Sequence, residues 1–208
     1  MSDVSSNMPR EWIENAMRLN PCRVLESGNI LTCPVRLSFP YLFEKQPPME
    51  DGGKAKYALT LLFPFGADLS VLRAEAARTA KEKWPNAGTE GGPRLHSPFR
   101  DQAEKLHFEG YQSGAIFITA SAERQPPVVD SRSVPVIDAA KAYPGAWALV
   151  SIRPFAFEKK AKKGVSFGLQ AVMMFADDKN LGGGSVDVNK EFAGIKIAQT
   201  DNSFDPFS

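Results

Sequence analysis

Aromatic and cationic side chains gather in one part of the sequence, the segment 145–157 and the turn after it. This segment predicts a strand with Val150 and Ile152 on its core face, because side chains alternate between the two faces of a strand. The opposite face and the turn then carry an arginine, two phenylalanines and four lysines: Arg153, Phe155, Phe157, Lys159, Lys160, Lys162 and Lys163. Bases stack on rings and phosphates pair with lysines, so this combination suits a single-stranded nucleic acid.

A second group of rings and cations follows the first predicted strand. Three rings recur there with a period of two between two cations, and the group is Arg36, Phe39, Tyr41, Phe43 and Lys45. On another predicted strand, Ile116 and Ile118 are expected to face the core, so Phe117 falls on the same face as the other candidate rings. Each ring has a structural alternative, because phenylalanine is usually buried, and a lysine cluster is often only a solvated turn.

The end of the chain has the opposite charge from its body. Residues 177–208 hold six acidic and three basic residues, a net charge of −3, whereas the remainder has a net charge of +4. A basic body with an acidic end suggests a polyanion site and a tail that competes for it. The tail residues that we expect to bind a partner are Asp201, Phe204, Asp205 and Phe207. A frayed terminus without a function is the alternative.

Metal-binding and catalytic motifs are absent from the sequence. Ten residues separate Cys22 from Cys33 and also His96 from His107, which is neither a zinc-finger nor a metalloprotease spacing. The acidic residues form no tight cluster for two metal ions, and the glycine-rich stretches lack the lysine and hydroxyl of a phosphate loop. We therefore predict no catalytic residue, no metal and no cofactor, and we expect both cysteines to be free, buried thiols.

Five segments have the alternation or the apolar content of strands, and one alanine-rich segment predicts a helix of about 17 residues. The strands are expected at 30–39, 56–65, 114–122, 145–157 and 165–175, the helix at 68–84, and a short helix within 1–20. With 43% apolar residues in 208, the predicted fold class is mainly β, a five-stranded antiparallel barrel of the oligonucleotide-binding (OB) type with long loops and a flexible C-terminal tail. An SH3-like barrel or an irregular sandwich would give much the same pattern.

In an OB barrel, the loops after the first and fourth strands border the ligand-binding face. We expect these loops at 40–55 and 158–164, so the two groups of rings and cations fall on the same face. The expected organisation is a tail and short helix at 1–29, the barrel at 30–192 and the acidic-aromatic tail at 193–208. No apolar run reaches the roughly 18 residues of a membrane helix, so we expect no membrane partner.

Several blocks of the sequence, in this order and spacing, resemble a family of bacteriophage single-stranded-DNA-binding proteins, long known only as a domain of unknown function. The blocks are VRLSFPYLFE (35–44), GKAKYALTLLFP (53–64), PPVVDSR (126–132), the segment 143–175 and LGGG (181–184). The resemblance implies an OB fold, binding of single-stranded DNA without sequence preference during phage replication and recombination, no catalysis, and a place in the cytoplasm of the infected host.

The resemblance also bears on partners. Similar proteins end in an acidic, phenylalanine-bearing tail that docks replication proteins, whereas this chain has only Asp201 and Asp205 there and ends in Ser208. The expected partners are single-stranded DNA, replication proteins of the phage or host at the tail, and further copies of the chain along DNA. Two other classes stay open at this point: a phage enzyme that processes nucleic acid, and a module whose exposed rings bind another protein.

Overall fold

The computed structural model describes residues 6–48, 53–159 and 162–182. Within these ranges the chain forms one nine-stranded sheet, two α-helices and two short 3-10 helices. The prediction of a mainly β protein is therefore confirmed. The number of strands is not the five that we expected, whereas the two α-helices lie in the two segments predicted to be helical, within 1–20 and 68–84.

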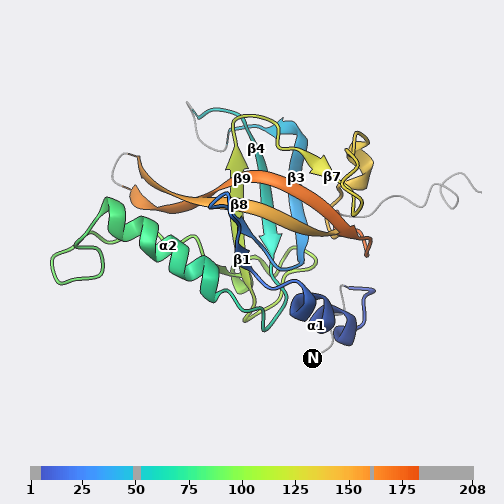
Figure 1. Cartoon of the computed structure of the whole chain (residues 1–208), viewed down its shortest axis with the longest axis horizontal. Coiled ribbons are helices and arrows are strands. Elements are labelled where there is room, and N and C mark those ends of the chain that lie inside the picture. The colour runs from blue at the N-terminus through green and yellow to red at the C-terminus, as the bar shows by residue number, and fades with distance from the viewer. Residues whose placement is uncertain (1–5, 49–52, 160–161, 183–208) are drawn as a thin grey trace, which may run out of the picture.

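Five strands have seven residues or more and form the body of the molecule. They are β3 (Val35–Gln46), β4 (Lys56–Leu62), β6 (Ile116–Ala122), β8 (Trp147–Lys159) and β9 (Lys162–Ala176). β3 pairs with β4, β4 with β6, β6 with β9, β9 with β8, and β8 with β3, so the pairings return to their starting strand. In Figure 1 the β8–β9 hairpin runs across the direction of β3 and β4 and extends toward α2.

The inner face of these strands is apolar because their side chains alternate. Leu37 of β3, Leu59 and Leu61 of β4 and Ile118 of β6 are completely buried in one cluster. Val150 and Ile152, which the alternation on β8 placed in the core, belong to the same cluster. Burial of such side chains contributes about 1.5–3 kcal/mol each, so this cluster fixes which face of each strand points outward.

Two-residue strands account for the difference in count. These are β1 (Arg23–Val24), β2 (Ile30–Leu31), β5 (Arg100–Asp101) and β7 (Val128–Val129). Two residues cannot display a period of two, so sequence alternation does not detect them. The sheet is mostly antiparallel, but it is not wholly so, because β9 pairs in parallel with β6 and with β7.

The segment expected to be a strand at 30–39 followed by a loop at 40–55 is organised differently. β2 ends at Leu31, and β3 begins at Val35 and continues to Gln46. The three rings of this region therefore lie on a strand rather than in a loop. A register shift between Ser38 and Tyr41 inserts an extra residue into β3, which accommodates Pro40 within the strand.

Both helices lie against the sheet and end near prolines or short polar turns. α2 (Ser70–Lys83) is shorter than the predicted 68–84, and the Asp68 carboxylate accepts the Ser70 N–H at 2.9 Å just before it. α1 (Arg10–Leu19) buries Ile13 and packs Trp12 edge-on against Trp147, with ring centroids 5.7 Å apart. A ten-residue helix is marginal alone, so this docking is what holds α1 in place. The 3-10 helices are Gln102–Lys105 and Ala139–Lys141.

Candidate nucleic-acid interface

One row of residues crosses the outer face of all five long strands. Tyr41 pairs with Ala58, Ala58 with Ser121, Ser121 with Gly168, and Gly168 with Arg153. Residues paired in this way share a face of the sheet. The row thus begins at a ring on β3 and ends at a cation on β8.

The neighbouring row confirms which face is outside. Leu59 pairs with Ala120, and Ala120 with Phe167, and all three side chains are buried in the core. Because side chains alternate, the row from Tyr41 to Arg153 must point away from the core. Arg153 is exposed and Ser121 half-buried, as this requires.

Small side chains cover the middle of this outer face. We call the following set the outer strip: Ala58, Thr119, Ser121, Ser166 and Gly168. Thr119 pairs with Thr60 of β4, and Ser166 pairs with Phe155 of β8, so the strip continues from β4 to the hairpin. Above Thr119, Ser121, Ser166 and Gly168 the small side chains leave room for a flat ligand, whereas Ala58 is only 6% exposed. Larger rings border the strip at both ends.

The hairpin carries the rings that border one end of the strip. Phe155 and Phe157 of β8 pair with Ser166 and Gly164 of β9, so small residues lie beside both rings. The Phe155 side chain is 41% exposed, and its ring carbon Cδ1 lies 3.9 Å from the place where a Cβ on Gly168 would be. A base can reach the exposed face of this ring, which fits the orientation that the sequence predicted.

The lysines of the turn do not all have the same surroundings. Lys159 and Lys162 are exposed, whereas Lys163 is half-buried and forms a 2.9 Å ion pair with Glu158. A hydrogen bond from Lys163 lowers the pKa of Glu158, which therefore stays ionised at neutral pH. Lys160 lies outside the described residues.

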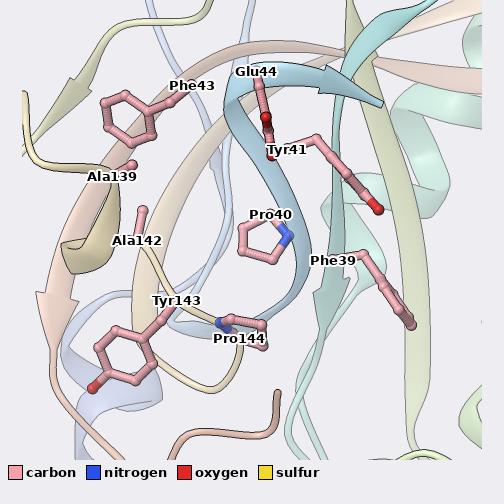
Figure 2. A pocket seen from close by; sticks show the side chains of 9 residues that line it. All are labelled: Phe39, Pro40, Tyr41, Phe43, Glu44, Ala139, Ala142, Tyr143 and Pro144. Carbon is pink, nitrogen blue, oxygen red and sulfur yellow. The ribbon is translucent and has the colours of Figure 1, made fainter. Parts of the chain in front are cut away.

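The rings of β3 line a pocket of about 670 Å³ at the other end of the strip. The pocket is lined by Phe39, Pro40, Tyr41, Phe43, Glu44, Ala139, Ala142, Tyr143 and Pro144. Figure 2 shows Phe43 on the Ala139 side of β3, with Tyr41 and Phe39 on the other side. The register shift after Ser38 breaks the period of two on which the three rings were grouped, so they do not form a single row.

Two of the predicted binding residues are wrong, because both side chains are buried. Arg36 is 3% exposed, and its guanidinium donates to the carbonyl oxygens of Gly145 and Lys179 at 3.2 and 3.0 Å. Phe117 is fully buried against Leu62 in a small cluster on the outer face. Neither side chain can reach a ligand in this conformation.

The remaining predicted residues lie at the edges of the site. Phe43 is half-buried and packs against the core, and Lys45 is exposed with its ammonium 5.6 Å from the centroid of the Tyr57 ring. The predicted tail residues Asp201, Phe204, Asp205 and Phe207 lie outside the described ranges. The rings and cations of β3 and those of the hairpin thus lie on the same side of the sheet, at opposite ends of the outer strip.

Sequence reasoning missed a further cluster on the same face. The ammonium of Lys105 lies within 6.0 Å of the ring centroids of Phe39, Phe108, Tyr111 and Phe117. The signal in the sequence is the three-residue spacing of Lys105, Phe108 and Tyr111, in a segment that has neither strand alternation nor a long helical pattern. This segment is the loop between β5 and β6.

Metal-binding clusters and membrane-spanning helices are absent from the described residues. No three His, Cys, Asp or Glu side chains among them come together as metal ligands, and Cys22 and Cys33 are both free and buried. In the part of the chain that the structure covers, no helix is both long and apolar enough to cross a membrane.

Comparison with protein families gives one match over most of the chain. The family model described as the single-stranded-DNA-binding protein of Enterobacter phage Enc34 matches residues 28–204. A curated relative is the putative protein p50 of Acyrthosiphon pisum secondary endosymbiont phage 1. It is 28% identical over 174 residues, which is 79% of this chain and 92% of p50.

Two solved structures share the fold. The single-stranded DNA-binding protein from bacteriophage Enc34, in complex with single-stranded DNA, superimposes with a TM-score of 0.63 and 24% identity, over 77% of this chain and 93% of that one. Gp2.5, a single-stranded DNA-binding protein encoded by bacteriophage T7, gives a TM-score of 0.51 and 14% identity, over 76% and 94% of the two chains.

Proposed function

This chain belongs to the family of the single-stranded-DNA-binding protein of Enterobacter phage Enc34, and from that premise we propose that it binds single-stranded DNA without sequence preference. The outer strip and the rings and cations at its two ends form the contact surface. Binding is non-catalytic: bases stack on exposed rings, and phosphates pair with lysines and arginines.

The observation that carries this proposal is the row from Tyr41 to Arg153. It joins a ring and a cation that are more than a hundred residues apart in the sequence, across a face otherwise made of small side chains. The exposed Phe155 ring lies directly beside this row. Aromatic platforms next to cations on the outer face of a sheet are what binding without sequence preference requires.

The fold proposed for this function is an OB-type barrel. The closed cycle of pairings among β3, β4, β6, β9 and β8 supports it, as does the one parallel pairing in that cycle. We assign residues 30–192 to the binding domain, with 1–29 as an N-terminal extension and 193–208 as a tail. The protein would act on replicating or recombining phage DNA in the cytoplasm of the infected host.

Fluorescence anisotropy with a labelled oligo-dT tests the proposal. We expect tight binding at low salt, a linear decrease of log K with log salt, and weaker binding of a duplex of the same length. A parallel incubation with Mg²⁺ tests for degradation of the oligonucleotide. Absence of binding would refute the proposed function, and Mg²⁺-dependent cleavage would favour an enzyme.

A further inference from the structure

The Lys105 cluster lies on the outer face, away from the hairpin. The distances from the Lys105 ammonium to the centroids of Phe39, Phe108, Tyr111 and Phe117 are 5.4, 6.0, 5.9 and 5.2 Å. An ammonium at such distances is attracted by the electron-rich faces of the rings. Four rings around a single lysine hold its flexible side chain in place.

The segment that carries Lys105 is tied to the sheet. Gln102 is buried, and its side-chain amide donates to the carbonyl oxygens of Phe63 and Ile116, at 2.9 Å each. The side-chain carbonyl oxygen of Gln102 accepts a hydrogen bond from the backbone N–H of Gln112 at 2.9 Å. These hydrogen bonds therefore fix the loop at Gln102, before Lys105, and at Gln112, after Tyr111. The position of the Lys105 ammonium is thus part of the fold.

Phe39 reaches the cluster through an unusual backbone conformation. Its φ is +48°, a region that residues other than glycine rarely adopt, and it lies at the register shift in β3. The shift turns its ring toward Phe108, and the two ring centroids are 5.1 Å apart in an edge-to-face arrangement. Backbone strain of this kind persists only where the surroundings impose it, and it is common at binding sites.

Charge and exposure leave this cluster open to an anionic ligand. The nearby carboxylate of Glu104 is held by Arg100, whose Nε donates to it at 3.0 Å. In the ranges that the structure covers, no carboxylate oxygen lies within 4.0 Å of the Lys105 ammonium. The Phe108 side chain is 40% exposed. Among the described residues, Lys105 is therefore a cation without a carboxylate partner, and it lies beside the partly exposed Phe108 ring.

We propose that Lys105, Phe39 and Phe108 form a second nucleotide subsite, in which a base stacks on Phe108 and Lys105 binds the adjoining phosphate. The proposal rests on the proposed binding of single-stranded DNA and extends it. The pairing of Ser38 with Thr60, and of Thr60 with Thr119, connects this subsite to the outer strip. A bound strand would then run from the hairpin rings across the strip to Phe108.

The surroundings of Lys105 agree with this role. Burial lowers the pKa of Lys105, and the positive charge of Arg100 lowers it further, whereas the negative charge of Glu104 offsets part of the decrease. A phosphate placed beside the ammonium would relieve both effects, because a negative charge favours the protonated lysine. Lys105 is thus a cation that gains from an anionic partner.

The test compares two substitutions of the same lysine with a surface control. Lys105→Met keeps the aliphatic stem among the rings and removes the charge, Lys105→Arg keeps a charge, and Lys81→Met removes an exposed lysine of α2. For Lys105→Met we expect about five-fold weaker binding of oligo-dT at low salt, and a log–log salt slope shallower by about 0.7. Lys105→Arg should restore most of the affinity, and Lys81→Met should bind as the parent protein does.

A second variant reports on the base directly. In Phe108→Trp the indole fluorescence should be quenched by oligo-dT, beyond the change in the parent protein, because bases stack on aromatic rings. Leu19→Trp, at an exposed position on α1, is the control and should show no added quenching. Thermal unfolding of each variant verifies that it is folded at the temperature of the measurement.

The outcomes separate this inference from the proposed function. If Lys105→Met binds with unchanged affinity and slope while Phe155→Ala is weakened, the Lys105 cluster is only structural and the inference is wrong. If the parent protein does not bind oligo-dT, the proposed function itself fails. Weaker binding by Lys105→Met with recovery in Lys105→Arg, together with quenching in Phe108→Trp, would support the subsite.

Discussion

Phe155 is an exposed ring on the β8–β9 hairpin. Because its side chain is 41% exposed, Phe155→Ala should cost about 1–3 kcal/mol of DNA binding and little stability. The matched control is Phe167→Ala on the paired strand, where a fully buried ring is removed and about 3–5 kcal/mol of folding stability should be lost. Oligo-dT affinity and the urea midpoint, measured on both variants, separate the two roles.

The stacking assignment for Phe155 would be wrong under one particular result. If Phe155→Ala unfolds as readily as Phe167→Ala and its folded fraction binds DNA normally, the ring is a packing residue. The same comparison applies to Phe157, which is half-buried opposite Gly164.

The turn lysines should determine much of the salt dependence. Each phosphate contact with a single strand contributes about −0.7 to the slope of log K against log salt, so alanine at Lys159, Lys160, Lys162 and Lys163 should flatten the slope by up to about 3. The ion pair with Glu158 should reduce the contribution of Lys163, because that carboxylate competes with phosphate for the ammonium. Glu158→Gln is the informative companion and should strengthen binding. An unchanged slope in the fourfold variant would mean that these lysines are only solvated and do not contact phosphates.

Alternation along β8 correctly predicted which residues face outward, since Arg153 and Phe155 are exposed and Val150 is buried. It could not predict that Arg36 is buried, because the carbonyl groups of Gly145 and Lys179 that accept its hydrogen bonds are 109 and 143 residues away in the sequence. An arginine on a strand resembles a surface cation until such distant carbonyl groups are placed around it. The burial of Phe117 was not predicted for a similar reason, because the loop that covers this ring has no regular sequence pattern.

At the level of elements, Asp178 connects the N-terminal segment to the end of β9. Its carboxylate accepts hydrogen bonds from Ser6 Oγ and the Asn7 N–H at 2.6 Å each, and from the Trp147 indole at 2.8 Å. Burial raises the pKa of Asp178, but these hydrogen bonds and one from the Lys179 N–H outweigh it, so the pKa lies below its usual value.

The sign of the pH effect follows from this direction. A depressed carboxyl pKa contributes stability above the unfolded pKa, which is near 3.9, and this contribution is lost as the pH falls through the folded pKa. Asp178→Asn should therefore lower stability at pH 7 by about 1–3 kcal/mol, because buried donors lose their charged acceptor, and it should reduce the loss of stability as the pH falls below about 4. Urea unfolding at these pH values measures both effects. Equal curves for Asp178→Asn and the parent protein would contradict this.

The long strands were predictable from sequence because each buries one face over seven or more residues. The extension of β3 to Gln46 was not, because Pro40 and Pro47 gave the segment the composition of a loop, and the register shift that tolerates Pro40 is a property of the pairing with β4. The parallel pairing of β6 with β9 was equally inaccessible. Strand partners are set by the packing of the whole chain, whereas alternation is a local property.

At the scale of the whole molecule, the candidate interface exists only because five strands align in register. Tyr41 and Arg153 share a row because β4, β6 and β9 lie between β3 and β8 in the sheet. The sequence indicated the kinds of residue that we propose to contact DNA, and even the hairpin that carries several of them. The small side chains of the outer strip carried no signal of their own, since serine, threonine, alanine and glycine occur everywhere.

The acidic end of the chain gives a prediction at the same scale. The described part ends at Gly182, where a Cβ would lie 3.4 Å from Pro144, one of the residues that line the pocket with Phe39 and Tyr41. The residues from 177 onward carry a net charge of −3, opposite to the body. An anion tethered near a cationic surface has an effective concentration of the order of millimolar, so weak contact would suffice to compete with DNA.

Deleting residues 199–208 should therefore tighten oligo-dT binding several-fold at low salt, and the gain should shrink as salt screens the charges. A tail with Asp201 and Asp205 replaced by Asn keeps its length and rings, and should reproduce part of the gain if charge is the cause. Pull-down of replication proteins should fall with the deletion, with Phe204→Ala or Phe207→Ala, and with the double Asp201→Asn and Asp205→Asn variant, because all four residues are expected to bind the partner. Weaker DNA binding after deletion would overturn competition and make the tail part of the DNA-binding surface or of a contact between copies.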